Sequence, residues 1–366
     1  MPPAASDPQP CRTLILGASY GSLLGTKLLL AGHPVTLVCT RSTAELIRRE
    51  GTVVRFPLRG REIDVPSAAL RGKLSAVTPE EADPSGFDLA VLAMQEGQYA
   101  APGVRELMRR IAGAGVPCLA VMNMPPLPFL RRLPVLREEP FVGCYAAEEV
   151  WAAFPPEQMT LTSADPQAFR PPDRPKNCLQ VSLPTNFKAA PFEEAAATAL
   201  LRRLAADIEA ARFDAGDGPL EIPVKLKVHD SLFVPLAKWP MLLTGNYRCI
   251  RPDGIISIRD AVLQDVERAR EMYAWVCELC HRLGADAADL VPFEKYAQAA
   301  EGLTRPASAA RALAGGATQI ERVDRLVQTI GLRLGRRSLL LDEIVALVDA
   351  WLERNRAAAG DASSAD

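Results

Sequence analysis

The chain has 366 residues, and because single hydrophobic cores usually stop growing at about 250–300 residues, we expect two domains. Hydrophobic residues make up 48% of the chain and charged residues 23%, which excludes a wholly disordered or fibrous protein. The formal net charge is -2, and no dense run of lysine and arginine occurs. The sequence therefore argues against nucleic acid as a partner.

The N-terminal residues, MPPAASDPQPCR, lack the basic and apolar regions of a signal peptide, so we interpret residues 1–11 as a disordered lead. No segment offers the roughly 18 uninterrupted apolar residues that a membrane span requires. The eight cysteines are spread irregularly, which favours reduced thiols over a disulfide framework. These features predict a soluble cytoplasmic protein.

The first half of the chain alternates between predicted strands and helices. Thr13–Leu16 is a continuous apolar run typical of a buried strand, Gly21–Leu30 has apolar residues at helical spacing, and Val35–Cys39 is a second apolar run. Further strands are predicted at Val53–Pro57, Glu62–Val65, Leu89–Ala93 and Cys118–Met122, with helices at Ser42–Glu50 and Val104–Ala112. The alternation predicts a doubly wound α/β sheet of the Rossmann type.

The second half is predicted to be mainly helical. Residues 141–187 contain short β-like runs and many prolines, and a helix is expected at Phe192–Ala211. The loop at 214–219 predicts the boundary between an α/β domain at 12–215 and a helical-bundle domain at 219–356, followed by a frayed tail at 357–366. Helices of the bundle are predicted at Val224–Leu236, Ile258–Leu283, Ala309–Ala314, Ile320–Leu334 and Leu341–Arg356.

A glycine-containing turn follows the first strand. Its residues are Gly17, Ala18, Ser19, Tyr20, Gly21 and Ser22. A dinucleotide pyrophosphate binds exposed backbone N–H groups at such a turn, but here a serine replaces the middle glycine of G-x-G-x-x-G and the loop is one residue short. Arg41 stands where NAD-binding proteins usually carry an acid, and a cation there favours the 2′-phosphate of NADP. An ordinary βα turn and a solvated arginine are the alternatives.

The sequence resembles the ketopantoate reductase family along almost its whole length. The similarity is carried, in order, by ILGASYGSLLGTKLLLAGHPVTLV, VVRFPLRGREIDVP, FDLAVLAMQEGQY, VPCLAVMNMPP, IPVKLKVHDSLFVPLA and ASAARALAGGATQIERVD. The resemblance implies a Rossmann domain followed by a helical domain, with an active site in the cleft between them. It also implies an NADP(H)-dependent reductase that acts on a small 2-oxo acid.

By position, the resemblance places Lys225 on the family's catalytic lysine and Asn123 on an asparagine near the nicotinamide. Ser308 and Gln319 fall on substrate-binding positions, and Gln98 keeps a glutamine of the cofactor site. The chain departs from the family pattern at four positions, namely Gln95 for a lysine, Met124 for a glycine, His229 for an asparagine and Gln319 for a glutamate. An alignment anchored on Pro235 puts Asp230 in place of the asparagine and leaves Lys227 as the reserve lysine.

The expected chemistry is carried by Lys225, since an ammonium group stabilises the charge that builds on a carbonyl oxygen and delivers a proton to it. We expect Lys225 to lie in a helix where partial burial lowers its pKa, with His229 as a proton relay. A surface lysine and a plain helical histidine are the alternatives. Asn123 would equally be a turn residue, and Ser308 the N-cap of the helix at Ala309–Ala314.

We therefore predict an NADP(H)-dependent reductase of a small 2-oxo acid, and we expect a substrate other than ketopantoate because the polar groups have changed. An imine-reducing, opine-type dehydrogenase and a catalytically silent NADP(H) sensor are the alternatives. A homodimer is expected from the apolar helix faces. No metal is expected, because the chain has only three histidines and the haem-like run Cys277–His281 lies in a predicted helix.

Overall fold

The computed structural model describes residues 9–216 and 218–363, and these divide into two compact units. The sheet unit comprises the residues up to Met94, Ala101–Met122 and Ala152–Val228. The helical unit comprises Gln95–Ala100, Asn123–Trp151 and the chain from His229 onward. The boundary expected at 214–219 thus lies inside the sheet unit, and two earlier segments join the helical unit.

The sheet unit is built on an eight-stranded sheet in the order β14-β11-β8-β7-β6-β1-β2-β5. Its strands are β1 (Thr13–Leu16), β2 (Val35–Val38), β5 (Leu74–Val77), β6 (Leu89–Leu92), β7 (Cys118–Val121), β8 (Met159–Thr162), β11 (Phe187–Ala189) and β14 (Leu226–Val228). The run from β5 to β8 is parallel, and β11 pairs antiparallel with β8. The predicted doubly wound sheet is confirmed.

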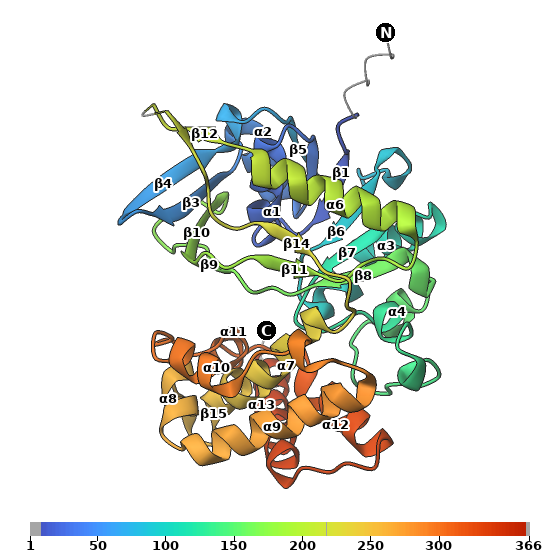
Figure 1. Cartoon of the computed structure of the whole chain (residues 1–366), viewed down its shortest axis with the longest axis vertical. Coiled ribbons are helices and arrows are strands. Elements are labelled where there is room, and N and C mark those ends of the chain that lie inside the picture. The colour runs from blue at the N-terminus through green and yellow to red at the C-terminus, as the bar shows by residue number, and fades with distance from the viewer. Residues whose placement is uncertain (1–8, 217, 364–366) are drawn as a thin grey trace. The chain divides into compact units, whose positions relative to one another are not determined.

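The helices of the sheet unit are α1 (Gly21–Leu30), α2 (Arg41–Glu50), α3 (Pro102–Gly113) and α6 (Ala195–Ala210). Every residue of α1 is buried, because this apolar helix packs against β1, β2 and β3 and also contacts α6 (Figure 1). A short pair, β12 (Phe213–Asp214) and β13 (Pro219–Leu220), follows α6. These elements fix the glycine turn at the carboxyl end of β1, where open α/β sheets bind ligands.

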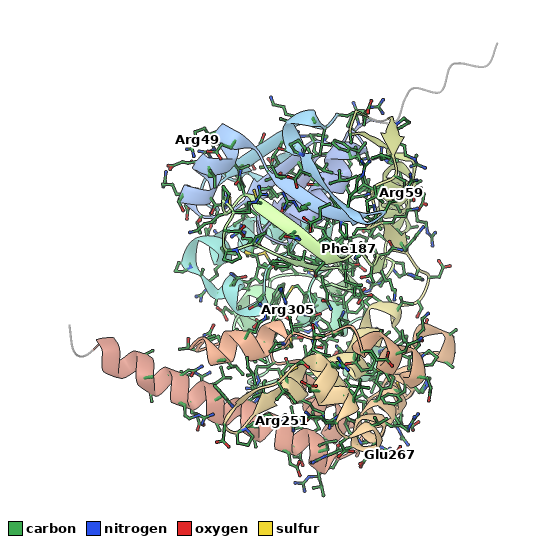
Figure 2. The ribbon with its side chains drawn as sticks, turned by 90° about the vertical axis from the view of Figure 1, so that its left-hand side faces the viewer. Arg49, Arg59, Phe187, Arg251, Glu267 and Arg305 are labelled. Carbon is green, nitrogen blue, oxygen red and sulfur yellow. The ribbon has the colours of Figure 1, made fainter. Side chains whose placement is uncertain are left out.

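A second, four-stranded sheet has the order β4-β3-β10-β9, with β3 (Val53–Leu58), β4 (Arg61–Pro66), β9 (Gln167–Phe169) and β10 (Cys178–Leu183). The strands predicted at Val53–Pro57 and Glu62–Val65 are confirmed as β3 and β4, which pair antiparallel, and β4 buries only Ile63 and Val65. Arg49 and Arg59 reach outward from this unit, whereas Phe187 lies within it (Figure 2).

The helical unit contains α4 (Leu127–Leu130), α5 (Glu148–Trp151), α7 (Lys238–Met241), α8 (Ile258–Leu263), α9 (Val266–Leu283), α10 (Phe293–Ala300), α11 (Ser308–Ala314), α12 (Val323–Arg333) and α13 (Leu339–Ser363). A hairpin of β15 (Ile250–Arg251) and β16 (Gly254–Ile255) precedes α8. The single helix expected at Ile258–Leu283 is two helices, because Asp265 caps α9 by accepting a hydrogen bond from the N–H of Arg268 at 3.0 Å.

Three local expectations are wrong. The helix expected at Val224–Leu236 is absent, because β14 pairs with β11 and a loop follows. Cys11, expected in the disordered lead, is buried and its N–H donates to Nδ1 of His33 at 3.1 Å. The tail expected to fray from residue 357 continues α13 to Ser363. Residues 1–8 and 364–366 of the expected lead and tail lie outside the described residues.

Among the described residues, none of the helices combines the length and the apolar character that crossing a membrane requires.

Candidate functional site

The glycine turn between β1 and α1 depends on its two glycines. Gly17 has a φ of +104°, and a Cβ there would lie 2.6 Å from the backbone oxygen of Ala93. A Cβ on Gly21 would lie 2.6 Å from Cγ2 of Ile15. Only glycine therefore allows the turn to pass this close to β6 and α1 to pack this close to β1. The packing of the turn therefore requires glycine at both positions, whether or not a ligand binds there.

The backbone of the turn offers donors for an anion. The N–H groups of Ala18 and Ser19 have no acceptor within residues 9–216 and 218–363. Ser22 is buried and its hydroxyl donates to the backbone oxygen of Ser19 at 2.7 Å, so Ser22 shapes the turn and is not exposed to a ligand. The hydroxyl of Tyr20 donates to the oxygen of Pro166 at 2.7 Å. The turn therefore fits a phosphate through backbone groups alone.

Two arginines lie at the carboxyl end of β2. Arg41 is exposed and begins α2 directly after Thr40. Arg170 follows β9, interacts electrostatically with Cys39, and has its pKa lowered by burial. No carboxylate pairs with Arg170 in the described part of the chain. Sequence reasoning missed Arg170, because a proline-rich segment far along the chain gives no signal of its neighbour on β2.

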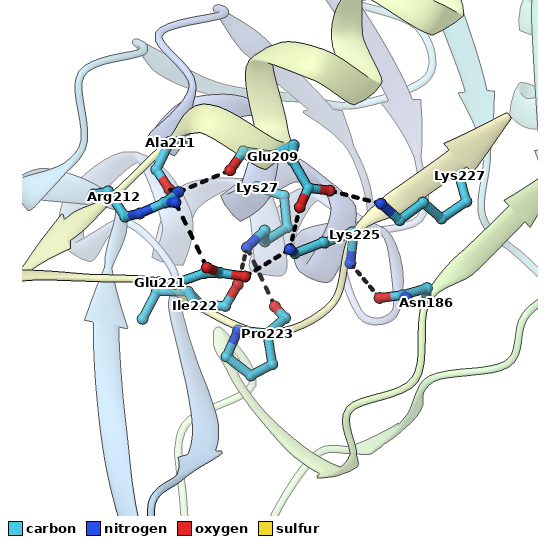
Figure 3. A network of polar contacts seen from close by, with 10 residues as sticks. All are labelled: Lys27, Asn186, Glu209, Ala211, Arg212, Glu221, Ile222, Pro223, Lys225 and Lys227. Atoms are coloured by element: carbon cyan, nitrogen blue, oxygen red, sulfur yellow. Dashed lines mark hydrogen bonds and ion pairs between the residues drawn. The ribbon is translucent and has the colours of Figure 1, made fainter.

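Lys225 does not lie in a helix and its pKa is not lowered. It precedes β14, and its ammonium group contacts the carboxylate of Glu209 and that of Glu221, the latter at 2.6 Å (Figure 3). These contacts, the one with Glu209 first, raise the pKa of Lys225. The reserve candidate Lys227 pairs with the same Glu209 at 2.7 Å. The expectation of a depressed pKa is therefore wrong, because two carboxylates stabilise the charged form.

Lys27 of α1 is the buried cation of this region. Its side chain is shielded from solvent, and its ammonium donates to the backbone oxygens of Ile222 at 2.5 Å and Pro223 at 3.2 Å (Figure 3). Burial lowers the pKa of Lys27 to about 8. These bonds tie the segment before β14 to α1, which is a structural role.

Four polar residues of the helical unit, Glu96, Asn123, Gln319 and Glu321, form a cluster that we name the Asn123 cluster. A Cβ on Gly97 would lie 2.9 Å from Oε1 of Gln319, so Gln319 reaches the segment that carries Glu96. The Asn123 amide and the N–H groups of Glu96 and Met124 donate hydrogen bonds to the Glu321 carboxyl. Asn123 thus contacts Glu321, and the exposed Gln319 lies beside the segment that carries Glu96.

Glu321 is one of the two titratable groups of the Asn123 cluster. Burial raises the pKa of its carboxyl to about 8, and the charge of Glu96 acts in the same direction. Sequence reasoning missed Glu321, although it stands two residues after Gln319. The only available signal was an acid in the motif ATQIERVD, and a single acid is usually solvated.

Glu96 anchors the cluster to the rest of the helical unit. Its carboxylate is 2% exposed and accepts hydrogen bonds from the N–H groups of Ala146 at 2.9 Å and Ala147 at 3.0 Å, and from Nε1 of Trp151 at 3.0 Å. Oδ1 of Asn123, by contrast, is buried and has no partner in the described part of the chain. One satisfied carboxylate and one unsatisfied amide oxygen therefore lie in the same cluster.

The other predicted residues lie at the surface or in loops of the helical unit. Gln95 and Gln98 are exposed, and Oε1 of Gln98 accepts from the N–H of Gln95 at 3.0 Å. Ser308 is the first residue of α11 and is exposed, while the N-cap is Ala307, so the N-cap alternative is wrong. His229 and Asp230 follow β14 in a loop.

The lysines of the helical unit are Lys238 and Lys295. Lys295 is exposed on α10, whereas Lys238 is partly buried at the start of α7. A π-helical turn at Leu242–Asn246 follows α7 and leads to Tyr247, whose hydroxyl donates to the backbone oxygen of Glu321. Turns of this kind are frequent at functional sites. Lys238 thus belongs to the segment that contacts the Asn123 cluster.

The described residues contain no group of three or more His, Cys, Asp or Glu side chains that would hold a metal ion. Cys277 and Cys280 both lie within α9, and burial raises the pKa of each thiol.

Comparison with known proteins identifies the fold. No family model matches the sequence, and no curated protein matches it. Among solved structures, a D-mandelate dehydrogenase with NADH and anilino(oxo)acetate has a TM-score of 0.63 at 15% identity, covering 94% of this chain and 99% of that chain. The 2-dehydropantoate 2-reductase from Methylococcus capsulatus has a TM-score of 0.65 at 16% identity, covering 94% and 97%.

A dimeric ketopantoate reductase from Staphylococcus aureus has a TM-score of 0.59 at 10% identity, covering 94% of this chain and 99% of that chain. The chain therefore has the ketopantoate-reductase fold, a parallel α/β sheet followed by a helical region, as its sequence motifs predict. This fold is shared with NAD(P)-dependent reductases of 2-oxo acids.

Proposed function

We propose that this protein is an NADP(H)-dependent reductase of a small 2-oxo acid. The observation that carries the proposal is the Asn123 cluster, in which Asn123 contacts a carboxyl of raised pKa and Gln319 lies beside the segment that carries Glu96. Perturbed carboxyls beside unsatisfied polar groups are typical of functional sites. Fold similarity to a dehydrogenase that holds NADH and an oxo acid supports the same conclusion.

The cofactor is assigned to the sheet unit. The free N–H groups of Ala18 and Ser19 fit the pyrophosphate, and Arg41 with Arg170 fits the 2′-phosphate of NADP. When bound, the nicotinamide supplies the hydride. The preference for NADP rests on these two arginines, because the position after β2 carries no acid to bind a ribose 2′-OH.

Lys238 is our candidate for the general acid, in place of Lys225. Lys225 is held by two carboxylates, and these raise its pKa away from the range that suits acid catalysis near neutral pH. Lys238 lies on the segment that leads to Tyr247 and Glu321. In this assignment Lys238 donates the proton to the carbonyl oxygen, while Asn123 and Gln319 bind and orient the oxo acid.

Steady-state oxidation of NADPH with a panel of 2-oxo acids tests the proposal. We expect turnover with at least one acid, and a loss of about 10²–10⁴-fold in kcat for Lys238→Ala, as for removal of a general acid. Lys225→Ala is the matched control, with an expected change of less than about threefold.

A panel in which nothing is turned over, despite tight NADPH binding, would favour a silent binding protein. If turnover required an added amine, the imine-reducing alternative would replace the oxo acid. If Lys225→Ala lost activity and Lys238→Ala kept it, our assignment of the acid would be reversed. A homodimer is proposed by similarity to the dimeric relative, and sedimentation of the purified chain tests it.

A further inference from the structure

The pairing of Asn123 with Glu321 leaves one end of an amide without a partner. The amide nitrogen of Asn123 donates to the Glu321 carboxyl, while its Oδ1 is buried and accepts no hydrogen bond within the described residues. A buried acceptor that lacks a donor is costly, so such atoms are rare in native proteins. In this orientation the Asn123 amide therefore lacks one hydrogen bond that the opposite orientation could supply.

The surroundings leave little freedom to Glu321. The hydroxyl of Tyr247 donates to the backbone oxygen of Glu321 and accepts from the N–H of Val323 at 3.0 Å, which fixes the chain on this side. The Glu96 carboxylate is held by two backbone N–H groups and by Trp151. The variables that remain are the proton on Glu321 and the orientation of the Asn123 amide.

We propose that Glu321 is a positioning residue whose ionisation decides which end of the Asn123 amide faces the substrate. As a carboxylate, Glu321 accepts from Nδ2 of Asn123 and leaves Oδ1 as the free end. As a carboxylic acid, Glu321 donates its proton to a hydrogen bond with Oδ1, the amide turns over, and Nδ2 becomes the free end. The inference rests on the proposed function, in which Asn123 contacts the oxo acid.

The other charged and titratable groups around Glu321 leave it as the group that changes state near neutral pH. Burial raises the pKa of Tyr247 well above its ordinary value, so this phenol stays protonated. Arg322 is paired with Asp324 at 2.9 Å and with Asp349 at 2.7 Å. Glu96 is held by three donors and contributes the negative charge that helps to raise the pKa of Glu321 to about 8.

Substrate affinity should follow the proton on Glu321. A 2-oxo acid presents oxygen acceptors, so it binds an outward Nδ2 and is disfavoured by an outward Oδ1. Below about pH 7 the acid form holds the amide in the binding orientation. Above about pH 9 the carboxylate recaptures Nδ2, and we expect KM for the oxo acid to rise about tenfold, the loss of one hydrogen bond to a charged ligand.

A ligand-free measurement tests the switch apart from the function. In protein labelled with ¹⁵N-asparagine, the Asn123 side-chain amide is assigned as the signal missing from Asn123→Ser. We expect it to shift between about pH 6.5 and 9.5 with one midpoint near the pKa of about 8, and to stay constant in Glu321→Gln. Asn355, whose amide donates to the oxygens of Leu313 at 2.9 Å and Ala317 at 2.8 Å, is the internal control.

A shift that persists in Glu321→Gln, or an Asn123 signal that does not move in the wild type, would overturn the inference. In steady-state kinetics, we expect KM for the oxo acid to rise with pH in the wild type and in Glu321→Asp, and to stay constant with pH in Glu321→Gln. A flat wild-type KM would also overturn it. Absence of any turnover would refute the proposed function, and the NMR result would still decide the switch.

Discussion

Lysine and glutamate side chains gather in the sheet unit, whereas an amide and two glutamates gather in the helical unit, and the two groups are satisfied to different degrees. Around Lys225, each ammonium has a carboxylate at contact distance, and Lys27 donates to two backbone oxygens. In the Asn123 cluster, Oδ1 of Asn123 has no partner in the described chain, and burial raises the pKa of Glu321 to about 8.

The comparison shows why charge alone is a poor guide to a site. The Lys225 group holds more charges, but those charges pair with one another and need no ligand. The Asn123 cluster holds fewer, and both burial and the charge of Glu96 oppose the ionisation of Glu321. We therefore assign chemistry to the second group and structure to the first.

The largest effect on stability is expected from Glu96→Ala. This substitution leaves the N–H groups of Ala146 and Ala147 and Nε1 of Trp151 buried without their acceptor. Loss of a buried charged partner costs about 3 kcal/mol or more in the free energy of unfolding. Urea denaturation measures it, with the exposed Glu138→Ala of the same unit as a control expected within about 0.5 kcal/mol. A cost near that of Glu138→Ala would contradict the buried anchor.

The two arginines of the sheet unit should set the choice of cofactor. We expect Arg41→Ala and Arg170→Ala each to weaken NADPH binding about tenfold, and to change NADH binding less than about twofold, because only NADPH carries the 2′-phosphate. Isothermal titration of each variant with both nucleotides measures the ratio. Arg174→Ala, an exposed arginine four residues beyond Arg170, is the control. Equal losses for both nucleotides would assign these arginines to another part of the cofactor.

The stability of the helical unit should depend on pH through Glu321. Its pKa in the folded protein, about 8, lies above the ordinary 4.5, so the folded state binds this proton more tightly than the unfolded state. The resulting stabilisation is complete below about pH 4.5 and is lost as pH rises through about 8. The Gln side chain of Glu321→Gln does not titrate. The melting temperature of this variant, measured relative to that of the wild type, should therefore rise by a few degrees between about pH 5 and pH 9. A gap independent of pH would contradict the raised pKa.

The smallest effect is expected from Lys225→Ala. Both carboxylate partners of Lys225 are largely exposed to solvent, and a second lysine, Lys227, still pairs with Glu209. Pairs of this kind contribute less than about 1 kcal/mol. Thermal unfolding of Lys225→Ala beside Lys227→Ala measures the loss. A cost above about 2 kcal/mol would mean that the Lys225 group is as critical as the Asn123 cluster.

The local hydrophobic pattern predicts the structure correctly where a short segment does not depend on a distant strand partner. The apolar runs of β1 and β2 and the ten residues of α1 appear where the sequence predicts them, because nearly every residue of these elements is buried. Gly17 and Gly21 were identified from the turn that they make possible. The order of motifs also predicted the fold that the comparisons show.

Segments that depend on distant partners were predicted less well. The run that begins at Val224 has helical spacing, but its backbone pairs with β11, a strand about 40 residues earlier in the chain, and becomes β14. Lys225 was placed in a helix for this reason. A long-range hydrogen-bonding partner overrides a weak local preference, and no window of sequence contains both.

The sequence by itself determined β1, β2, β6 and β7, the glycine turn and the presence of Asn123 and Gln319 among the polar candidates. Only the tertiary structure decided that Glu96 and Glu321, separated by more than two hundred residues, would meet at Asn123, and that Lys225 would be neutralised by Glu209. Burial and proximity set the pKa of a side chain, and both are properties of the folded chain rather than of the residue.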